Sequence, residues 1–185
     1  AGTGDFLKVC LQNNWTVFGT EPNQKAREIA KQKQLFLKND LQEFSNNKFD
    51  VITLWHVLEH VENVSEFISQ LKNLLSENGK LIVAVPNFKS DDAKHYKEFW
   101  AAFDVPRHLW HFSQKSIHLL FENENMSVQK ILPMKFDSFY VSMLSEKYKT
   151  GKLNFLIGFW RGFVSNWKAR KTSEYSSLIY IIKKD

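Results

Sequence analysis

The sequence contains a single cysteine, Cys10, among its 185 residues. One cysteine excludes an internal disulfide framework and any zinc site built from several cysteines. This usage is compatible with a reducing compartment, and we expect a cytoplasmic protein. Cys10 lies in an apolar, helix-like stretch, so we interpret it as a core residue and not as a nucleophile.

Long apolar runs are also absent. The longest, 153–160, is interrupted by Asn154 and Gly158 and is far shorter than the roughly 20 residues of a membrane-spanning helix. No basic-then-apolar segment typical of a secretory signal opens the chain. Hydrophobic residues make up 43% and charged residues 24% of the sequence, which excludes a disordered or collagen-like chain and predicts one globular domain.

The net charge of +5 is unevenly distributed along the chain. Residues 147–185 hold 9 Lys and Arg against 2 Asp and Glu, a net charge of +7, whereas residues 1–146 hold 16 against 18, a net charge of −2. A basic tail on a nearly neutral body indicates contact with phosphate, acidic lipid or an anionic substrate. The alternative is a solvated basic face that aids solubility.

β-prone runs alternate with segments of helical periodicity. Expected strands are 16–20, 35–37, 49–55, 81–85, 128–136 and 177–182, and expected helices include 23–32, 64–75 and 113–121. The helix at 64–75 has one apolar stripe, and we expect Gly79 to end it in a left-handed conformation. This alternation predicts βαβ units and a mostly parallel sheet.

Polar residues follow several of the expected strands. They are Glu21, Asp40, the segment around His56, and Asn87. In open α/β sheets, ligands bind in the crevice at the carboxyl ends of the strands. The clustering of these residues is therefore the first indication of a functional site.

The chain opens with Gly2-Thr3-Gly4 before an apolar stretch. Glycines let the backbone approach a ligand closely, and a following helix presents free amide groups. Glu21 comes 17 positions after Gly4, where a carboxylate can accept two hydrogen bonds from a ribose diol. Because such a turn normally follows a strand, we expect the first strand of the sheet to be missing from this chain.

With these motifs, the chain resembles the class I S-adenosylmethionine-dependent methyltransferases, in the branch that includes the ubiquinone-biosynthesis O-methyltransferases. The resemblance is carried by Ala1–Gly4, Glu21, Asp40-Leu41, Phe49–Ile52, Val57–Val61, Asn78–Leu81 and Val85–Asn87. It implies a doubly wound, mostly parallel, seven-stranded Rossmann-like sheet. It also implies one methyltransferase domain over 1–185, incomplete at its N-terminus, with substrate-side insertions at about 88–112 and 138–171.

The resemblance implies a site for S-adenosylmethionine. Its residues would be Ala1, Gly2, Thr3, Gly4, Glu21, Pro22, Asp40, Leu41, Trp55 and His56. Glu21 would hold the ribose hydroxyls, Asp40 would lie near the adenine amino group, and Trp55 and His56 would line the pocket near the sulfonium. Because the cofactor itself supplies the activated methyl group, no catalytic triad is expected.

His56, Glu59 and His60 stand at i, i+3 and i+4, so a helix would place them on one face. The matching segment of the ubiquinone O-methyltransferases resembles a divalent-metal site, with a glutamate in place of His56. Histidine-rich ligation does not favour Mg²⁺. We therefore expect no metal, and interpret Glu59 and His60 as residues that hold the turn after the strand.

The segment 99–112 combines aromatic residues with candidate catalytic groups. His108 or His111 is a candidate general base for a hydroxyl acceptor, because imidazole titrates near neutral pH. Arg107 is a candidate ligand for a substrate carboxylate or phosphate. The alternative is that Arg107 pairs with Asp104 and that the histidines hydrogen-bond to the loop backbone.

The aromatic stretch 153–167 runs into the basic cluster 168–171. This combination suits peripheral membrane contact through 153–171, or a cover for a lipophilic acceptor. The alternative is a pair of helices packed on the sheet, with the aromatic side chains in the core.

The sequence thus predicts a methyltransferase that moves a methyl group from S-adenosylmethionine to a small-molecule acceptor, with oxygen as the expected acceptor atom and S-adenosylhomocysteine as the product. The acceptor is expected to be lipophilic or anionic, and no nucleic-acid partner is expected because no RNA- or DNA-binding module is added. The alternatives are a non-catalytic binding module that retains the fold and, less favoured, a nucleotide-dependent oxidoreductase.

Overall fold

A computed structural model describes all residues of the chain, 1–185. It contains two compact units, Ala1–Asn47 and Lys48–Asp185, each of which is described by itself. The first unit contains helices α1 (Asp5–Gln12) and α2 (Gln24–Gln32) and the 3-10 helix η1 (Leu41–Phe44). The helix expected at 23–32 is confirmed as α2, and the Asn23 side chain caps it by accepting a hydrogen bond from the Ala26 amide at 3.1 Å.

The strands expected at 16–20 and 35–37 are not formed. These segments meet at one parallel bridge between Thr20 and Lys38, flanked by hydrogen bonds from the Glu21 amide to the Lys38 carbonyl and from the Lys38 amide to the Gly19 carbonyl, both 2.9 Å. A strand needs a neighbour along its whole length to satisfy its backbone groups. In this unit neither segment has one, so they remain extended connections.

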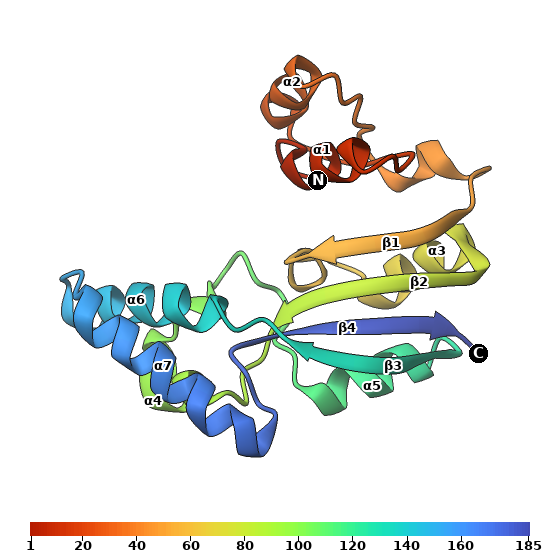
Figure 1. The fold of residues 1–185 in the computed structure, drawn as a ribbon. Helices are drawn as coiled ribbons and strands as arrows, with labels where there is room; N and C mark the ends of the chain where they lie inside the picture. The colour runs from red at the N-terminus through yellow and green to blue at the C-terminus, as the bar shows by residue number, and fades with distance from the viewer. The chain divides into compact units, whose positions relative to one another are not determined.

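The second unit is built on one four-stranded sheet in the order β1-β2-β4-β3 (Figure 1). The strands are β1 (Phe49–Trp55), β2 (Leu75–Pro86), β3 (Met126–Pro133) and β4 (Ser177–Lys184). β1 and β2 are parallel, whereas β4 runs antiparallel to both β2 and β3. The α/β class is confirmed, but the sheet is mixed rather than mostly parallel, and seven strands are not found. An apolar run indicates that a strand is buried and does not indicate its direction.

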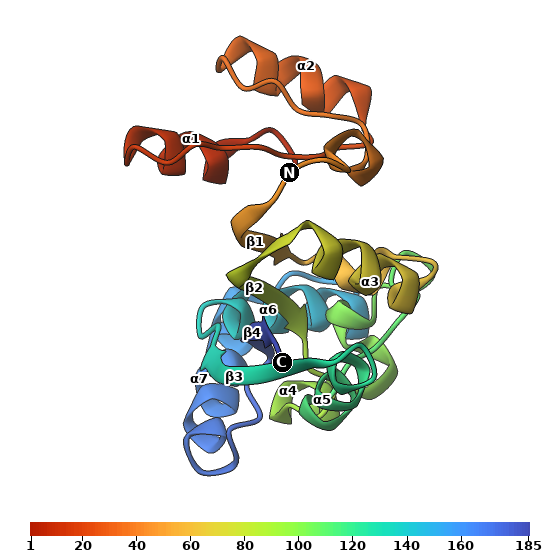
Figure 2. The same ribbon diagram turned by 90° about the vertical axis from the view of Figure 1, so that its right-hand side faces the viewer.

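Helices α3 (Val64–Leu74) and α5 (Gln114–Glu122) cover the sheet (Figures 1 and 2). The core between helices and strands contains fully buried Ile68, Leu71, Val83, Ile117 and Phe121. A second group of elements gathers beyond the carboxyl ends of β1 and β2 (Figure 1). It comprises α4 (Asp91–Tyr96), η3 (Lys97–Phe99), η4 (Ala101–Phe103), α6 (Asp137–Thr150) and α7 (Phe155–Thr172).

Gly79 does not end α3 in the expected way. The helix ends at Leu74 and the chain passes directly into β2, within which Gly79 has no left-handed backbone. A Cβ atom at this position would lie 2.7 Å from Leu75 Cγ and 3.0 Å from the Phe49 carbonyl oxygen. Glycine is therefore required by the close approach of these groups, at the irregular pairing that begins β1 and β2.

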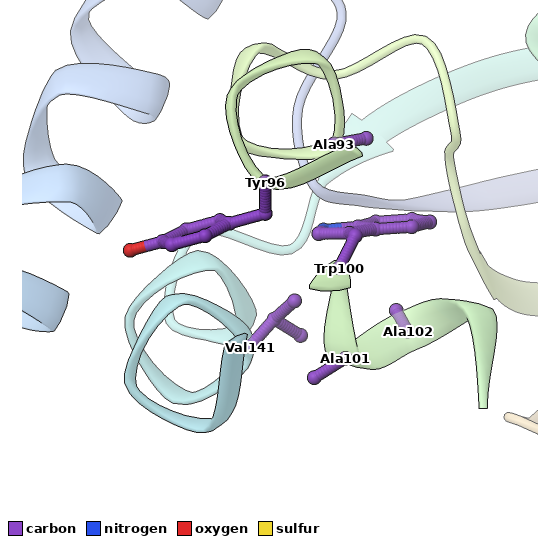
Figure 3. Packing of buried hydrophobic residues seen from close by; sticks show 6 residues of the cluster. All are labelled: Ala93, Tyr96, Trp100, Ala101, Ala102 and Val141. Atoms are coloured by element: carbon purple, nitrogen blue, oxygen red, sulfur yellow. The ribbon is translucent and has the colours of Figure 1, made fainter. Parts of the chain in front are cut away.

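The elements beyond the strand ends have a small core of their own. Figure 3 shows the Trp100 ring between Ala93 on one side and Ala101 and Ala102 on the other, with Val141 of α6 beside them. Trp100 donates a hydrogen bond from Nε1 to the buried carboxylate of Asp92 at 2.7 Å. This core fixes the segment after β2 against α6.

Candidate active site

The glycine turn of the first unit has the backbone that its sequence predicts. Gly2 and Gly4 both have left-handed φ angles, +55° and +79°, and Gly4 is the N-cap residue of α1. A Cβ atom at Gly4 would lie 2.7 Å from Leu35 Cδ1, whereas the space beside Gly2 is open. Both positions therefore favour glycine, and Gly2 leaves room for a ligand to approach the backbone.

Glu21 is bound to this turn by its carboxylate. Oε2 accepts a hydrogen bond from the Gly2 amide at 2.7 Å, and Oε1 accepts one from the Asn23 amide at 3.0 Å. Burial by itself would raise the pKa of Glu21, but the amides of Asn23 and Gly2 outweigh it and lower the pKa. The carboxylate is thus ionised at neutral pH. Oε2 also accepts from the Ala1 nitrogen at 3.2 Å, whereas Oε1 retains acceptor capacity for a further donor.

The other predicted residues of the first unit lie around the turn and the bridge. The Ala1 nitrogen donates to the Thr20 carbonyl at 2.6 Å, and the Thr3 hydroxyl donates to Asp5 at 2.7 Å. Asp40 is exposed and caps η1 by accepting from the Gln42 amide at 2.8 Å; Pro22 is exposed and Leu41 is half-buried.

Sequence reasoning missed Arg27. Its guanidinium donates to the carbonyls of Glu21 and Pro22, both at 2.6 Å, and to the Asn39 side chain at 3.0 Å. It thereby joins the segments that carry Glu21 and Asp40. No pattern in the sequence marks this role, because an arginine on an amphipathic helix ordinarily faces solvent.

In the second unit, Trp55 and His56 stand at the carboxyl end of β1. The His56 amide donates to the Ala84 carbonyl at 3.0 Å, yet its φ angle is +52°, in the left-handed region that non-glycine residues seldom adopt. This turn directs the imidazole toward two carboxylates. Nδ1 lies 3.1 Å from Glu59 Oε1, and Nε2 lies 3.8 Å from Asp137 Oδ2.

Two atoms of this group are buried without a hydrogen-bond partner, His56 Nε2 and Glu59 Oε2. Glu59 is fully buried, and its backbone carbonyl accepts the amides of Leu109 and Trp110 at 2.8 and 3.2 Å. Unpartnered buried polar atoms are rare in folded proteins and need an explanation, such as a catalytic role or an absent ligand. Asp137 was missed by sequence reasoning, because it begins a helix far from His56 in the chain.

Burial by itself would lower the pKa of His56. The hydrogen bond with Glu59 and the negative charges of Asp137 and Glu59 outweigh this effect, so the pKa of His56 is raised. With Nδ1–H directed at Glu59, a neutral His56 carries its free lone pair on Nε2. The arrangement is that of a proton acceptor oriented by a carboxylate.

The predicted catalytic residues after β2 make contacts within their own loop. Arg107 pairs with Asp104 at 2.7 Å and its side chain is 73% exposed. His108 Nδ1 lies 2.8 Å from the Ala102 carbonyl oxygen, and His111 Nε2 lies 2.9 Å from the Phe103 carbonyl oxygen. These contacts match the alternative in which Arg107 pairs with Asp104 and the histidines hydrogen-bond to the loop backbone. Burial lowers the pKa of His108. A catalytic role for Arg107, His108 or His111 stays a prediction.

The sequence placed His56, Glu59 and His60 together as potential metal ligands, but the structure groups different residues. Glu59, His60 and His108 each offer one ligand atom within 4.8 Å of the others, whereas His56 faces Glu59 and Asp137. The His60 and His108 rings meet edge to face with centroids 4.6 Å apart, and His60 Nδ1 lies 2.9 Å from the Arg107 carbonyl oxygen. The same contacts hold the loop against η2 (Leu58–His60), and the expected absence of a metal stays a prediction.

Asn87, the last of the polar residues that follow the expected strands, has a structural role. Its side-chain amide donates to Glu174 at 2.7 Å and to the Tyr175 carbonyl at 3.1 Å, and its oxygen accepts the Lys89 amide at 3.1 Å. Its amide donors join the end of β2 to the segment before β4, and its oxygen holds the turn after β2. We therefore do not include Asn87 in the candidate site.

Comparison with known proteins identifies the family. The sequence profile of a methyltransferase domain matches residues 1–131. The chain belongs to this methyltransferase family. An uncharacterized methyltransferase of Anoxybacillus flavithermus is 31% identical over 99 residues, which cover 50% of this chain and 47% of that protein. A ubiquinone biosynthesis O-methyltransferase of Rickettsia bellii is 28% identical over 107 residues, which cover 52% and 43%. The methyltransferase chain thus spans about half the length of the curated relatives it matches.

Solved structures support the methyltransferase fold. A SAM-dependent methyltransferase of Thermotoga maritima superposes with a TM-score of 0.68 at 17% identity, over 100% of this chain and 78% of that one. Magnesium protoporphyrin IX methyltransferase of Synechocystis, solved with bound SAH, gives a TM-score of 0.63 at 18% identity, over 100% and 71%. At these identities the likeness shows the fold alone.

Proposed function

We propose that the chain carries out S-adenosylmethionine-dependent methylation of a hydroxyl oxygen on a small molecule. Membership of the methyltransferase family supports methyl transfer, and the ubiquinone biosynthesis O-methyltransferases among the relatives support oxygen as the acceptor. One observation in the structure carries the assignment to oxygen. It is the buried, unpartnered Nε2 of His56, oriented by Glu59 through Nδ1.

The first unit has groups that suit the cofactor. The open space at Gly2 admits a ligand against the backbone, and the ionised Glu21 carboxylate suits a ribose diol. Asp40 is exposed and retains an oxygen for an adenine amino group. When bound, S-adenosylmethionine would supply an activated methyl group on a positively charged sulfur. Trp55 and His56 remain predicted cofactor-side residues as well.

The second unit supplies the group that accepts a proton. Methylation of a hydroxyl forms an oxygen–carbon bond while the sulfur–methyl bond breaks, and S-adenosylhomocysteine would leave with the electron pair of that bond. The hydroxyl proton is released, and His56 Nε2 can take it as a general base. Glu59 holds the imidazole in the required tautomer and stabilises its protonated form, as a carboxylate does for a catalytic histidine. Asp137 adds a second negative charge beside Nε2.

Cofactor binding is tested by calorimetric titration with S-adenosylhomocysteine. We expect micromolar affinity, weakened tenfold or more, about 1.4 kcal/mol, in the Glu21→Ala variant. Glu28→Ala is the matched control, because Glu28 is an exposed acid of the same unit that contacts only Gln24 in a side-chain hydrogen bond. Absence of binding by the unmodified chain, or equal loss in both variants, would refute the cofactor site.

Methyl transfer is tested with a panel of phenols, catechols and aliphatic alcohols, with amines and thiols in parallel, by following S-adenosylhomocysteine release. We expect turnover of a hydroxyl compound and a loss of 10²–10⁴-fold in kcat in His56→Gln, the range for general acid–base catalysis. His118→Gln, at an exposed site on α5, should retain full activity. Turnover of amines alone would overturn the oxygen assignment. Cofactor binding without turnover of any class would favour the non-catalytic module.

A further inference from the structure

In the hairpin of α6 and α7, helix α7 buries its small residues and exposes its large apolar ones. The residues that α7 buries are small: Gly158, Gly162, Ser165 and Ala169. A Cβ atom at Gly158 would lie 2.6 Å from Met143 Cα, and one at Gly162 would lie 2.8 Å from Phe139 Cα. Ser138 of α6 is buried at the same interface, and its hydroxyl donates to the Gly162 carbonyl at 3.2 Å. The two backbones therefore approach closely.

The large apolar side chains of α7 consequently point outward. We call this surface the aromatic face; its members are Phe155 (61% exposed), Leu156 (84%), Phe159 (58%), Trp160 (62%), Phe163 (48%) and Trp167 (58%). Each member has another member three or four residues away, so they adjoin one another along the helix. The helix of a soluble domain ordinarily buries its large apolar residues and exposes its polar ones. Apolar groups gathered in this way mark an interaction surface.

The charges carried by α7 and by the segment that precedes it have one sign. Residues 147–173, which span the end of α6 and all of α7, hold seven Lys and Arg and no Asp or Glu. Lys168 pairs with Asp91 at 2.8 Å, whereas Lys152, Arg170 and Lys171 are exposed. No helix of the chain is long and apolar enough to cross a membrane. Aromatic side chains flanked by basic ones instead suit a helix that lies in the lipid headgroup region.

We propose that the aromatic face of α7 docks on an anionic lipid bilayer, with its rings at the level of the headgroups and the basic residues against lipid phosphates. A second copy of this chain fits the surface less well. A symmetric dimer would set the same patch against itself, and so bring the positive charges that flank it on the two copies together. The lipid surface supplies the opposite charge and also accommodates exposed aromatic rings.

Flotation with lipid vesicles tests this docking. We expect the chain to bind vesicles in which a third of the phosphatidylcholine is replaced by phosphatidylglycerol, at least tenfold more tightly than vesicles of phosphatidylcholine alone. The double variant Leu156→Ser/Trp160→Ser should weaken binding to the anionic vesicles tenfold or more. Both side chains are exposed, so these changes should leave the fold intact, which circular dichroism would verify. Leu119→Ser, at a 49% exposed site on α5, is the control and should bind normally.

Sedimentation velocity of the same proteins tests whether a second copy of the chain, instead of a lipid bilayer, covers the aromatic face. We expect the unmodified chain to remain a monomer at micromolar concentration. A dimer that the double variant abolishes would show that a second copy covers the aromatic face and would overturn the proposal. Absence of vesicle binding by the unmodified chain, or equal binding by the double variant and the control, would overturn it as well. None of these readouts depends on methyl transfer.

Discussion

His56 combines a left-handed backbone, a hydrogen bond to a buried carboxylate and an unpartnered Nε2. A non-glycine residue in this conformation is strained, and such strain persists where the surrounding structure fixes the residue and is frequent at functional sites. Here the surroundings are the β1–β2 ladder, through the His56 amide, and Glu59, through the imidazole. The residue is therefore oriented by its neighbours on both sides.

The pH dependence of the reaction follows from the raised pKa of His56. A general base must be neutral, so kcat/KM should fall as the pH drops through a pKa above the ordinary value of 6.5. Glu59→Gln removes a negative charge that raises this pKa and replaces a charge-assisted hydrogen bond by a neutral one, so the acidic limb of the profile should move to lower pH. Asp137→Asn should move it in the same direction. A limb that stays in place in both variants would show that the carboxylates have a merely structural role.

Asp92 is a buried residue whose partners predict a large effect on stability. Its carboxylate accepts hydrogen bonds from Trp100 Nε1 and the hydroxyls of Ser165 and Ser176, all at 2.7 Å. Asp92→Ala would leave three buried donors unsatisfied, and we expect the free energy of unfolding in urea to fall by about 3 kcal/mol or more. Asp91→Ala, which removes a partly exposed ion pair, should cost about 1 kcal/mol or less. Equal effects of the two substitutions would contradict this account.

At the scale of elements, the sequence patterns located helices α2, α3 and α5 and the strands of the second unit. The helices expected at 64–75, 23–32 and 113–121 correspond to α3, α2 and α5 of the structure. Patterns could not reveal the direction of β4, which depends on packing and not on its own residues. They also could not show that 16–20 and 35–37 pair at a single bridge, because β propensity is realised only against a neighbouring strand.

Only the part of the candidate site that follows local motifs could be predicted from the sequence. Gly2, Gly4 and Glu21 follow a local motif, and the structure brings Gly2 and Glu21 together. The contacts of His56 with Asp137 and of Arg27 with Asn39 join residues that are far apart in the sequence and belong to no motif. From the sequence, the aromatic residues of α7 could face either a membrane or the protein core, because large and small apolar residues occur on all sides of the expected helix. Only the structure shows that the small ones face α6.

The close packing of α6 and α7 predicts that a methyl group at Gly162 is destabilising. Replacing glycine by alanine in a helix ordinarily gains about 1 kcal/mol, because alanine has the higher helix propensity. Gly162→Ala should instead reduce stability by about 1–3 kcal/mol, since the new Cβ atom would meet the Phe139 backbone. Thermal unfolding measures the difference. Arg170→Ala, at an exposed position of the same helix, should change stability by about 0.5 kcal/mol at most, and a stabilised Gly162→Ala would show that the helices are not in close contact.

At the scale of the whole molecule, charge is separated along the chain. Residues 1–146 carry a net charge of −2 and residues 147–185 a net charge of +7. The proposed cofactor groups, Gly2, Glu21 and Asp40, lie in the first segment, and the proposed lipid-binding helix lies in the second. The two binding events should therefore respond differently to salt, because one depends on neutral ribose hydroxyls and the other on attraction between opposite charges.

Salt concentration accordingly separates the two functions in one preparation. The screening length falls from about 10 Å at 0.1 M to about 3 Å at 1 M ionic strength. Over this range, we expect binding to anionic vesicles to weaken tenfold or more, down to the level measured on phosphatidylcholine alone, because only the contact between the aromatic face and lipid would remain. The affinity for S-adenosylhomocysteine should change less than twofold in the same buffers. Vesicle binding that withstands salt would show that Lys152, Arg170 and Lys171 make no contact with lipid phosphates, and that the aromatic side chains account for the attachment alone.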